Sequence, residues 1–375
     1  MKTFIKEIKN YLKFLKSQTK NKKKNIYFYS ENSNYKNYLI EILNKLNNSN
    51  KFKIIYFTSD EKDILDHAGI ETYFIGKGLI RIIFFTFLKC DLMIMTLTDL
   101  NNYEIKKSKN CKSYLYVFHS LMSVFKGYNK NAFQNYDIIF TNGEYQKKEL
   151  KIMEEQNNLR KKLIFNVGYT YINNLKKKIN RTIKDDTILF APSWIKQKND
   201  LIDKYGKKII AELIKINKVI LRPHPQSLIK SKNEITSIVK KFQFNPRFIF
   251  NNNLEKISTL DVSSILVTDN GGMAMEYYIL YNRPVISINY LDKIHNEDYK
   301  TLGLEALEDS FKKEFTKVIE INDIGRIKEI SENYIKNFKF DKKKLDSFLN
   351  KNGIILEEAS ENAYSKICEL MSDLD

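Results

Sequence analysis

Three short segments in the second half of the chain combine residue types that could bind a phosphate group and stabilise its transfer. They are Ala191-Pro-Ser-Trp194, Arg222-Pro-His-Pro225 and Asp269-Asn-Gly-Gly272. In the second segment, prolines on both sides of His224 restrict the backbone and fix the imidazole at little entropic cost. In the third, a glycine turn that opens a helix leaves backbone N–H groups unpaired, where the helix dipole also favours negative charge. A pre-positioned imidazole beside an arginine and a helix amino terminus is what a pyrophosphate leaving group requires.

The surrounding elements must bring these segments together. Each segment follows a short apolar run without alternation, which is typical of a parallel strand buried on both faces. Because the carboxyl ends of parallel strands meet at one edge of a sheet, we expect the segments to converge there. Helix-spaced apolar residues over 273–281 predict a helix after the glycines, with Glu276 one turn in and within reach of a sugar hydroxyl. The alternative is that Asn270 only caps a structural helix and that Asp269 is a solvated turn residue.

Strand-like and helix-like segments alternate along most of the chain, which predicts parallel sheets with helices on both faces. A polar, lysine-rich stretch over 173–184 is typical of a linker between two such sheets. The sequence therefore predicts an α/β protein with two doubly wound, Rossmann-like domains that face each other across a cleft. We expect a basic helix over 1–24, an acceptor domain over 25–175, a nucleotide-donor domain over 176–320, and helices over 321–375 that pack back across the hinge. Strands are expected at 26–30, 53–58, 72–75, 91–95, 113–118, 137–141, 163–167, 187–191, 218–222, 247–250, 265–268 and 285–289.

In the first predicted domain, His119 follows the apolar run 113–118 and so lies at the carboxyl end of a strand. Catalytic and binding groups collect at that position in open α/β sheets. From there, His119 could take a proton from an attacking hydroxyl. A buried structural histidine is the alternative.

The amino-terminal residues 1–24 predict a basic amphipathic helix that could lie on an anionic membrane surface. A helix packed on the body with a solvated charged face is the alternative. Its predicted apolar face consists of Phe4, Ile5, Ile8, Tyr11, Leu12 and Leu15.

The formal net charge of +18, from 63 Lys and Arg against 45 Asp and Glu, predicts attraction to phosphates in nucleic acid, anionic lipid or a small molecule. A basic nucleic-acid-binding protein is the weaker alternative, because the basic residues are dispersed and no helix-turn-helix, RNA-recognition or zinc pattern occurs. The 3 cysteines are widely spaced, which argues against a disulfide framework and for a reducing compartment. No secretory signal or membrane span is indicated, so we expect a cytoplasmic protein or one peripheral on the inner face of the cell membrane.

The segments also carry a resemblance to a known family. Phe190-Ala-Pro-Ser-Trp194, Leu221-Arg-Pro-His-Pro225 and Val267-Thr-Asp-Asn-Gly-Gly272, followed by Arg283-Pro284, resemble the motif series of the CDP-glycerol glycerophosphotransferase family, the teichoic acid primases and polymerases. Phe118-His-Ser120 resembles that family's His-Gly motif. The resemblance implies a GT-B fold and transfer of a glycerol phosphate, or a related polyol phosphate, from a CDP-linked donor. The acceptor hydroxyl would belong to a lipid-linked or glycan acceptor in surface polysaccharide synthesis.

By this resemblance, His119 matches the proposed base and His224 matches the residue that serves the donor phosphates. No metal and no cofactor are expected, because Arg222, His224 and helix amides can carry the charge of the leaving group. The residues expected to bind the donor phosphates or nucleotide are Ser193, Trp194, Arg222, Asp269, Asn270, Gly271, Gly272, Met273 and Glu276.

Two departures point to an alternative donor. The family usually has a Ser-Ser pair where this chain has Gly271-Gly272, and an Asp where this chain has Glu276. Residues 268–272 with Glu276 look closer to the Asp-Ser-Gly-Gly and following Glu of the UDP-N-acetylglucosamine 2-epimerases. Those enzymes share the GT-B fold and use that segment for nucleotide phosphate and ribose. The alternative is therefore a GT-B glycosyltransferase or 2-epimerase that uses a UDP-, GDP- or CMP-linked sugar.

Overall fold

The computed structural model describes residues 2–18, 23–63, 65, 69–179, 186–195, 199–252 and 257–373. The chain forms two compact units. The first contains Met1–Ser120, Asn129–Asn174 and Leu349–Asp375, and the second contains Leu121–Tyr128 and Leu175–Phe348. Residues 121–128, which the sequence places in the first domain, thus pack in the second unit, and the last residues of the chain return to the first.

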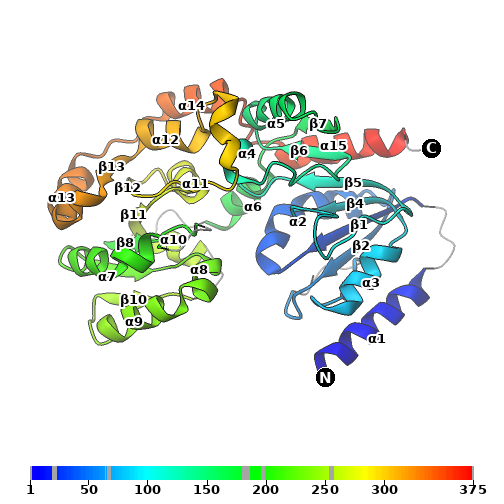
Figure 1. Cartoon of the computed structure of the whole chain (residues 1–375), viewed down its shortest axis with the longest axis horizontal. Coiled ribbons are helices and arrows are strands. Elements are labelled where there is room, and N and C mark those ends of the chain that lie inside the picture. Colours follow the sequence, from blue (N-terminus) through cyan, green and yellow to red (C-terminus); the bar gives the residue numbers. More distant parts are fainter. Residues whose placement is uncertain are drawn as a thin grey trace. The chain divides into compact units, whose positions relative to one another are not determined.

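The first unit is built on a seven-stranded sheet with the order β3-β2-β1-β4-β5-β6-β7 (Figure 1). All neighbouring strands are parallel. Most strand residues are β-branched or aromatic and buried, as expected for a sheet that helices cover on both faces. The strands are β1 (Asn25–Ser30), β2 (Lys53–Thr58), β3 (Glu71–Phe74), β4 (Cys90–Met95), β5 (Cys111–Val117), β6 (Ile138–Thr141) and β7 (Leu163–Asn166).

Two helices far apart in the sequence cover one face of this sheet. In α2 (Ser33–Asn48) and α15 (Ala359–Ser372), side chains such as Ile42 and Ile367 join a core cluster with strand residues. The carboxyl-terminal helix therefore completes the core of the first unit. Its other helices are α1 (Lys2–Ser17), α3 (Leu79–Phe87), α5 (Glu144–Gln156) and α6 (Thr170–Lys178), of which α6 crosses the boundary to the second unit.

Helix α1 docks through an aromatic cluster. The Phe14 ring lies edge-on to Phe57 at 4.9 Å and to Phe84 of α3 at 5.9 Å, measured between ring centroids. The docked side of α1 is not the apolar face expected from the sequence, because Phe14 and the buried Glu7 lie on another side of the helix at 100° per residue. Four residues of the expected face are exposed instead: Phe4, Ile5, Leu12 and Leu15.

The second unit contains a six-stranded sheet with the order β10-β9-β8-β11-β12-β13, again with all neighbours parallel (Figure 1). Helices α7 (Leu201–Leu213), α9 (Lys232–Phe242) and α13 (Ile327–Asn337) pack their apolar residues into its core cluster. The strands are β8 (Thr187–Phe190), β9 (Lys218–Leu221), β10 (Phe248–Phe250), β11 (Ser263–Thr268), β12 (Val285–Asn289) and β13 (Lys317–Glu320). The remaining helices are α4 (Val124–Gly127), α8 (Pro225–Lys230), α10 (Ile257–Val262), α11 (Gly272–Tyr281), η1 (Glu297–Leu302), α12 (Leu307–Phe315), η2 (Ile321–Arg326) and α14 (Lys342–Lys351).

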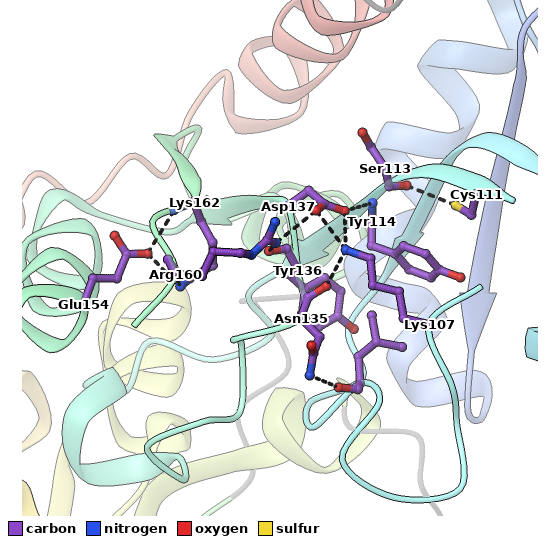
Figure 2. Close-up of polar contacts among 11 residues, drawn as sticks. Lys107, Cys111, Ser113, Tyr114, Asn135, Tyr136, Asp137, Glu154, Arg160 and Lys162 are labelled. Carbon is purple, nitrogen blue, oxygen red and sulfur yellow. Dashed lines mark hydrogen bonds and ion pairs between the residues drawn. The ribbon is translucent and has the colours of Figure 1, made fainter. Parts of the chain in front are cut away.

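Asp137, which directly precedes β6, joins the start of that strand to the middle of β5 (Figure 2). Its carboxylate accepts a hydrogen bond from the backbone N–H of Tyr114 at 2.9 Å. Lys107 Nζ donates to it at 2.8 and 2.9 Å, and Arg160 donates at 2.9 Å. This cluster lies at the edge of the sheet opposite the carboxyl ends of the strands, so it stabilises the fold and leaves the other edge for chemistry.

The predicted fold class is confirmed: the described residues contain every strand expected from the sequence, within two residues at each end. The sequence missed β13, because no strand is predicted after 285–289. Only Val318 and Ile319 of β13 are apolar, and the strand pairs with β12 alone, so its strand signal is short. The predicted linker 173–184 begins inside α6. The lysine-rich end of the predicted helix 1–24 lies partly outside the described residues.

Two of the cysteines are close in space although they are distant in sequence. Cys90 and Cys111 are register partners in β4 and β5, and their Sγ atoms are 3.3 Å apart as free thiols. Burial raises the pKa of the Cys90 thiol well above its usual value, which keeps the thiol protonated and unreactive.

Candidate functional site

The carboxyl ends of β8, β9 and β11 are adjacent, because β8 pairs with β9 on one side and with β11 on the other. The segments that follow these strands are in contact. The backbone N–H of Ser193 donates to Asp269 Oδ1 at 2.7 Å. The rings of Trp194 and His224 are stacked, with centroids 6.3 Å apart and planes at 22°. A Cβ on Gly271 would lie 3.6 Å from the Cβ of Ser193.

The structure orients His224 so that one ring N–H is a hydrogen-bond donor. His224 is the N-cap of α8, and its Nδ1 accepts the backbone N–H of Gln226 at 3.1 Å. Pro225 follows as the first residue of the helix, where a missing N–H costs no intrahelical hydrogen bond. Because Nδ1 accepts, the ring proton is on Nε2, so His224 presents an N–H donor. Arg222, two residues earlier, is half-buried at the end of β9.

Helix α11 begins at the glycines without a side-chain cap, since its N-cap is Gly271. The backbone of Gly271 is extended, with φ 176, and its Cβ position has room, so neither strain nor crowding demands glycine there. A missing side chain instead leaves the first-turn amides uncovered, as an anion site requires. Gly272 and Met273 start the helix half-buried, whereas Glu276 is only 3% exposed. Contact between Glu276 and a sugar hydroxyl therefore requires a ligand that reaches this buried carboxylate.

Both the amide nitrogen and the amide oxygen of the Asn270 side chain are hydrogen-bonded to later residues, so Asn270 is not a simple helix cap. Its Nδ2 donates to the carbonyl oxygen of Leu291 at 2.9 Å and to Asp292 Oδ1 at 3.2 Å. Its Oδ1 accepts from Lys312 Nζ at 3.0 Å. Lys312 also donates to Asn289 Oδ1 at 2.8 Å. The loop before the glycines is thus fixed by elements that come later in the chain.

Two partly buried lysines, Lys293 and Lys312, lie beside this loop. Burial lowers the pKa of Lys293, while the carboxylates of Asp269 and Glu308 act in the opposite direction. Burial also lowers the pKa of Lys312, opposed by Asp292, Asp309 and Asp269. Desolvated cations are costly unless they interact with anions, and these carboxylates supply that interaction here.

Lys293, Lys312 and His295 were not among the residues expected from the sequence. The His295 ring packs edge-on against Trp194, with centroids 6.0 Å apart. Lys293 and His295 follow β12, the neighbour of β11, so they lie at the same edge of the sheet. The strand-end rule used for the other segments would have found these two, but no comparable signal marks Lys312 on α12.

Two buried carboxyl groups lie among these loops. Burial raises the pKa of Asp269, although the hydrogen bond from the Ser193 backbone opposes this. Burial, with Asp203 and Asp269 nearby, raises the pKa of Asp200 to about 6. Asp200 caps α7 by accepting the N–H of Asp203 at 3.2 Å, and Ser227 Oγ of α8 donates to it at 3.4 Å. Asp200 thereby joins the segment after Trp194 to the helix that His224 begins.

His119 belongs to the first unit, where it follows β5. The Tyr116 hydroxyl lies 3.1 Å from its Nδ1. The rings of Tyr35 and Tyr38 pack edge-on against it, with centroids 5.2 and 5.8 Å away. When Nδ1–H donates to Tyr116, Nε2 is the acceptor nitrogen, which is the tautomer that a general base needs.

The cavities of the two units differ in size. In the second unit, a cavity of about 10 Å³ lies between Asn270, Ser287, Glu308 and Lys312, too small for a nucleotide. A cavity of about 330 Å³ in the first unit is lined by α5, β7 and α15 and contains no expected site residue. The described residues hold no group of three or more His, Cys, Asp or Glu side chains that could bind a metal ion. Within the same residues, no helix has the length and apolar character needed to cross a membrane.

Comparison with known proteins places the fold. No protein-family model matches the chain, and no curated protein sequence matches it. Among solved structures, a variant of the wall teichoic acid polymerase TagF matches with a TM-score of 0.57 at 13% identity, covering 100% of this chain and 98% of that chain. The UDP-GlcNAc 2-epimerase of Methanocaldococcus jannaschii, in complex with UDP-GlcNAc and UDP, matches with a TM-score of 0.56 at 13% identity, covering 93% and 99%.

A third similar structure is S. aureus MnaA with UDP, with a TM-score of 0.59 at 12% identity, covering 93% of this chain and 97% of that chain. Identities this low establish the fold alone. Together with the two parallel sheets of seven and six strands, they define this chain as a two-domain GT-B protein.

The raised pKa of Asp200 predicts a stabilising substitution. A carboxyl group with a folded-state pKa near 6 contributes stability below its unfolded pKa, and this contribution is lost as pH rises through about 6. Asp200→Asn removes the ionisation and keeps the oxygen that caps α7. At pH 7.5 the variant should therefore be more stable than wild type by on the order of 2 kcal/mol. Thermal unfolding between pH 4.5 and 8 measures this difference, which should shrink toward the acid end. Parallel pH profiles for the two proteins would contradict the assignment.

Proposed function

We propose that this protein is a cytoplasmic GT-B transferase of surface polysaccharide or teichoic-acid-type polymer synthesis. It moves a glycerol phosphate, or a related polyol phosphate, from a CDP-linked donor to an acceptor hydroxyl on a lipid-linked or glycan acceptor. The observation that carries the proposal is the contact among the segments that follow β8, β9 and β11. These segments gather Trp194, His224, Asp269 and the glycine turn at one edge of the second sheet.

In this proposal, the second unit binds the nucleotide diphosphate. The Nε2–H of His224 donates to a phosphate oxygen as negative charge develops on the leaving group. Arg222, Lys293 and the amides at the start of α11 supply further positive charge, so the step needs no metal. Trp194 offers its ring as an apolar wall for the bound donor. The Ser193 hydroxyl is an additional donor beside Asp269.

The first unit would supply the general base. We assign this role to His119, with its Nδ1–H donating to the Tyr116 hydroxyl and its Nε2 accepting the proton of the acceptor hydroxyl. The surrounding tyrosine rings restrict the imidazole, which lowers the entropic cost of placing it.

A second candidate function is a glycosyltransferase or 2-epimerase that uses a nucleotide sugar. The observation that favours it is the pair Gly271-Gly272 at the start of α11, followed by Glu276 in the same helix. UDP-GlcNAc 2-epimerases are among the proteins with this fold to which the chain is similar.

The identity of the nucleotide separates the two candidates. Calorimetric titration with CDP, UDP, GDP and CMP should give measurable binding of the cytidine nucleotides CDP and CMP, and little of UDP and GDP, if the donor is CDP-linked. Enzyme with CDP-glycerol and an acceptor should then release CMP. Binding of UDP without CDP would reject the glycerophosphate assignment and favour the second candidate.

Substitution of His224 tests the chemistry without removing the helix cap. Asn is a good N-cap, so His224→Asn should keep α8 intact while it deletes the Nε2–H donor. We expect turnover to fall by about two orders of magnitude or more, the scale of a charge-stabilising or acid–base group. His224→Ala loses the cap as well and should combine the same loss of turnover with a lower melting temperature. Near-normal turnover in the Asn variant would exclude the assigned role.

We further propose that the first unit associates with an anionic membrane surface. Helix α1 docks through Phe14 and leaves Phe4, Ile5, Leu12 and Leu15 exposed, beside the exposed Lys9, Lys13 and Lys16. The adjacent α3 exposes Leu79 and Phe87. Exposed apolar side chains flanked by lysines are typical of a helix that lies in an anionic lipid interface.

Vesicle binding measures this association. The double variant Leu12→Glu with Leu15→Glu should lose most of its sedimentation with phosphatidylglycerol vesicles, because it places charge on the apolar side of α1. Phe244→Glu is the matched control, since Phe244 is 90% exposed and lies in the second unit. Equal sedimentation of both variants and wild type would contradict the proposal. Retained binding to uncharged phosphatidylcholine vesicles would remove the role of the lysines.

A further inference from the structure

The strap, defined as residues 121–128, begins two residues after His119 but packs in the second unit. Residues 121–127 are buried, although they form only the short helix α4. The polar groups of a buried irregular segment need hydrogen-bond partners. The partners of the strap therefore identify the elements that it stabilises.

The first contact joins the strap to α12 in a reciprocal pair. The backbone N–H of Ser123 donates to Glu308 Oε2 at 2.9 Å, and Ser123 Oγ accepts the backbone N–H of Leu307 at 2.8 Å. Each segment thereby satisfies an unpaired N–H group of the other, as in a capping box. Glu308 lines the small cavity beside Asn270.

The second contact is a buried ion cluster. Lys126, which is 2% exposed, lies with its Nζ 2.6 Å from Asp309 Oδ2 and 3.5 Å from Asp292 Oδ2. Burial lowers the pKa of Lys126, but the hydrogen bond and charge of Asp309, with Asp292 and Glu308, raise it above the usual value. The lysine is therefore a fixed positive charge between two carboxylates.

The third contact ties the strap backbone to the segment after β12. The carbonyl oxygen of Lys126 accepts the backbone N–H of His295 at 2.9 Å, and that of Phe125 accepts Asn296 Nδ2 at 3.0 Å. The strap thus binds both elements that grip Asn270, namely α12 and residues 291–296.

Asp292 is the link between the strap and the glycine turn. Its Oδ2 faces Lys126, while its Oδ1 accepts the Nδ2 of Asn270 at 3.2 Å. Lys126 is therefore one side chain removed from the residue that precedes Gly271. A carboxylate shared in this way is oriented by both partners, so loss of either changes the position available to the other.

We infer that Lys126 is a positioning residue for the Asp269–Gly272 turn, which it reaches from the strap through Asp292 and Asn270. The inference rests on the proposed function in treating the turn as the phosphate site. Asp309 and Asp292 hold Lys126, Asp292 holds Asn270, and Asn270 fixes the start of α11.

The experiment compares Lys126→Met with a buried lysine elsewhere. Met keeps the length of the side chain but leaves Asp292 and Asp309 without their cation. Lys162→Met is the matched control, because Lys162 Nζ lies 2.7 Å from Glu154 with both side chains nearly buried, but in the first unit. Both variants lose a buried ion pair, so general destabilisation affects both.

Two measurements are made on each full-length variant: affinity for the nucleoside diphosphate that wild type binds, and hydrogen exchange of the amides of residues 269–274. We expect Lys126→Met to weaken binding roughly tenfold and to speed exchange of these amides, whereas Lys162→Met changes neither. Asp309→Asn keeps the shape of the side chain that Lys126 contacts but removes its charge. It should weaken nucleotide binding and speed amide exchange by smaller amounts than Lys126→Met. If Lys126→Met does not fold, Asp309→Asn takes its place in the comparison.

Wild-type affinity and wild-type exchange in Lys126→Met would overturn the inference, as would equal effects in the Lys162→Met control. A failure of the proposed function would give a result different from a failure of the Lys126 inference. If wild type binds no nucleoside diphosphate, the assigned function fails, and the exchange of the turn amides still decides whether Lys126 positions them.

Discussion

The hydrogen bond from the backbone of Ser193 to the carboxylate of Asp269 is the interaction on which the candidate site depends. It joins the ends of β8 and β11, which are neighbours in the second sheet. With this bond in place, Trp194 lies over His224 and the glycine turn lies against Ser193. Each of these contacts follows from parallel strands that end at the same edge of one sheet.

The charges at this edge are unfavourable for stability. Asp200, Asp269 and Glu308 all have pKa values raised by burial, and the pKa values of Lys293 and Lys312 are lowered by it. A cluster of buried ionisable groups with opposed shifts is typical of a functional site, because well-packed apolar residues would stabilise the same volume better. The cluster around Asp137 in the first unit differs, since its cations remain partly exposed and bind a single carboxylate at the amino edge of the sheet.

The similarity to a teichoic acid polymerase and to UDP-GlcNAc 2-epimerases fits the sequence of the glycine turn, which resembles motifs of both. Both kinds of protein share this fold at identities too low to choose between them. The residues at which the sequence departs from the motifs of the glycerophosphotransferases, Gly271, Gly272 and Glu276, all belong to α11 or its cap. In both candidate functions, donor identity would therefore be read at the start of α11, while the surrounding framework is common to the two.

The sequence by itself determined every described strand except β13, the two sheets and the meeting of the three segments. These follow from local rules: short apolar runs make buried parallel strands, and glycine and proline mark where they end. No pattern in the sequence indicated β13, because two of its four residues, Lys317 and Glu320, are charged. The sequence misjudged which side of α1 is docked, because the helix is anchored by Phe14, a residue outside its apolar stripe.

Only the tertiary structure decided which side chains surround the glycine turn. Lys312 reaches Asn270 from α12, and Lys126 reaches Asp292 from a segment more than a hundred residues earlier in the chain. No periodicity or motif marks such residues, because their role arises from contacts between elements that are distant in sequence. The burial of a particular charged residue likewise cannot be predicted from a sequence in which lysines are abundant. It depends on the neighbouring side chains that exclude water, which only the folded chain brings together.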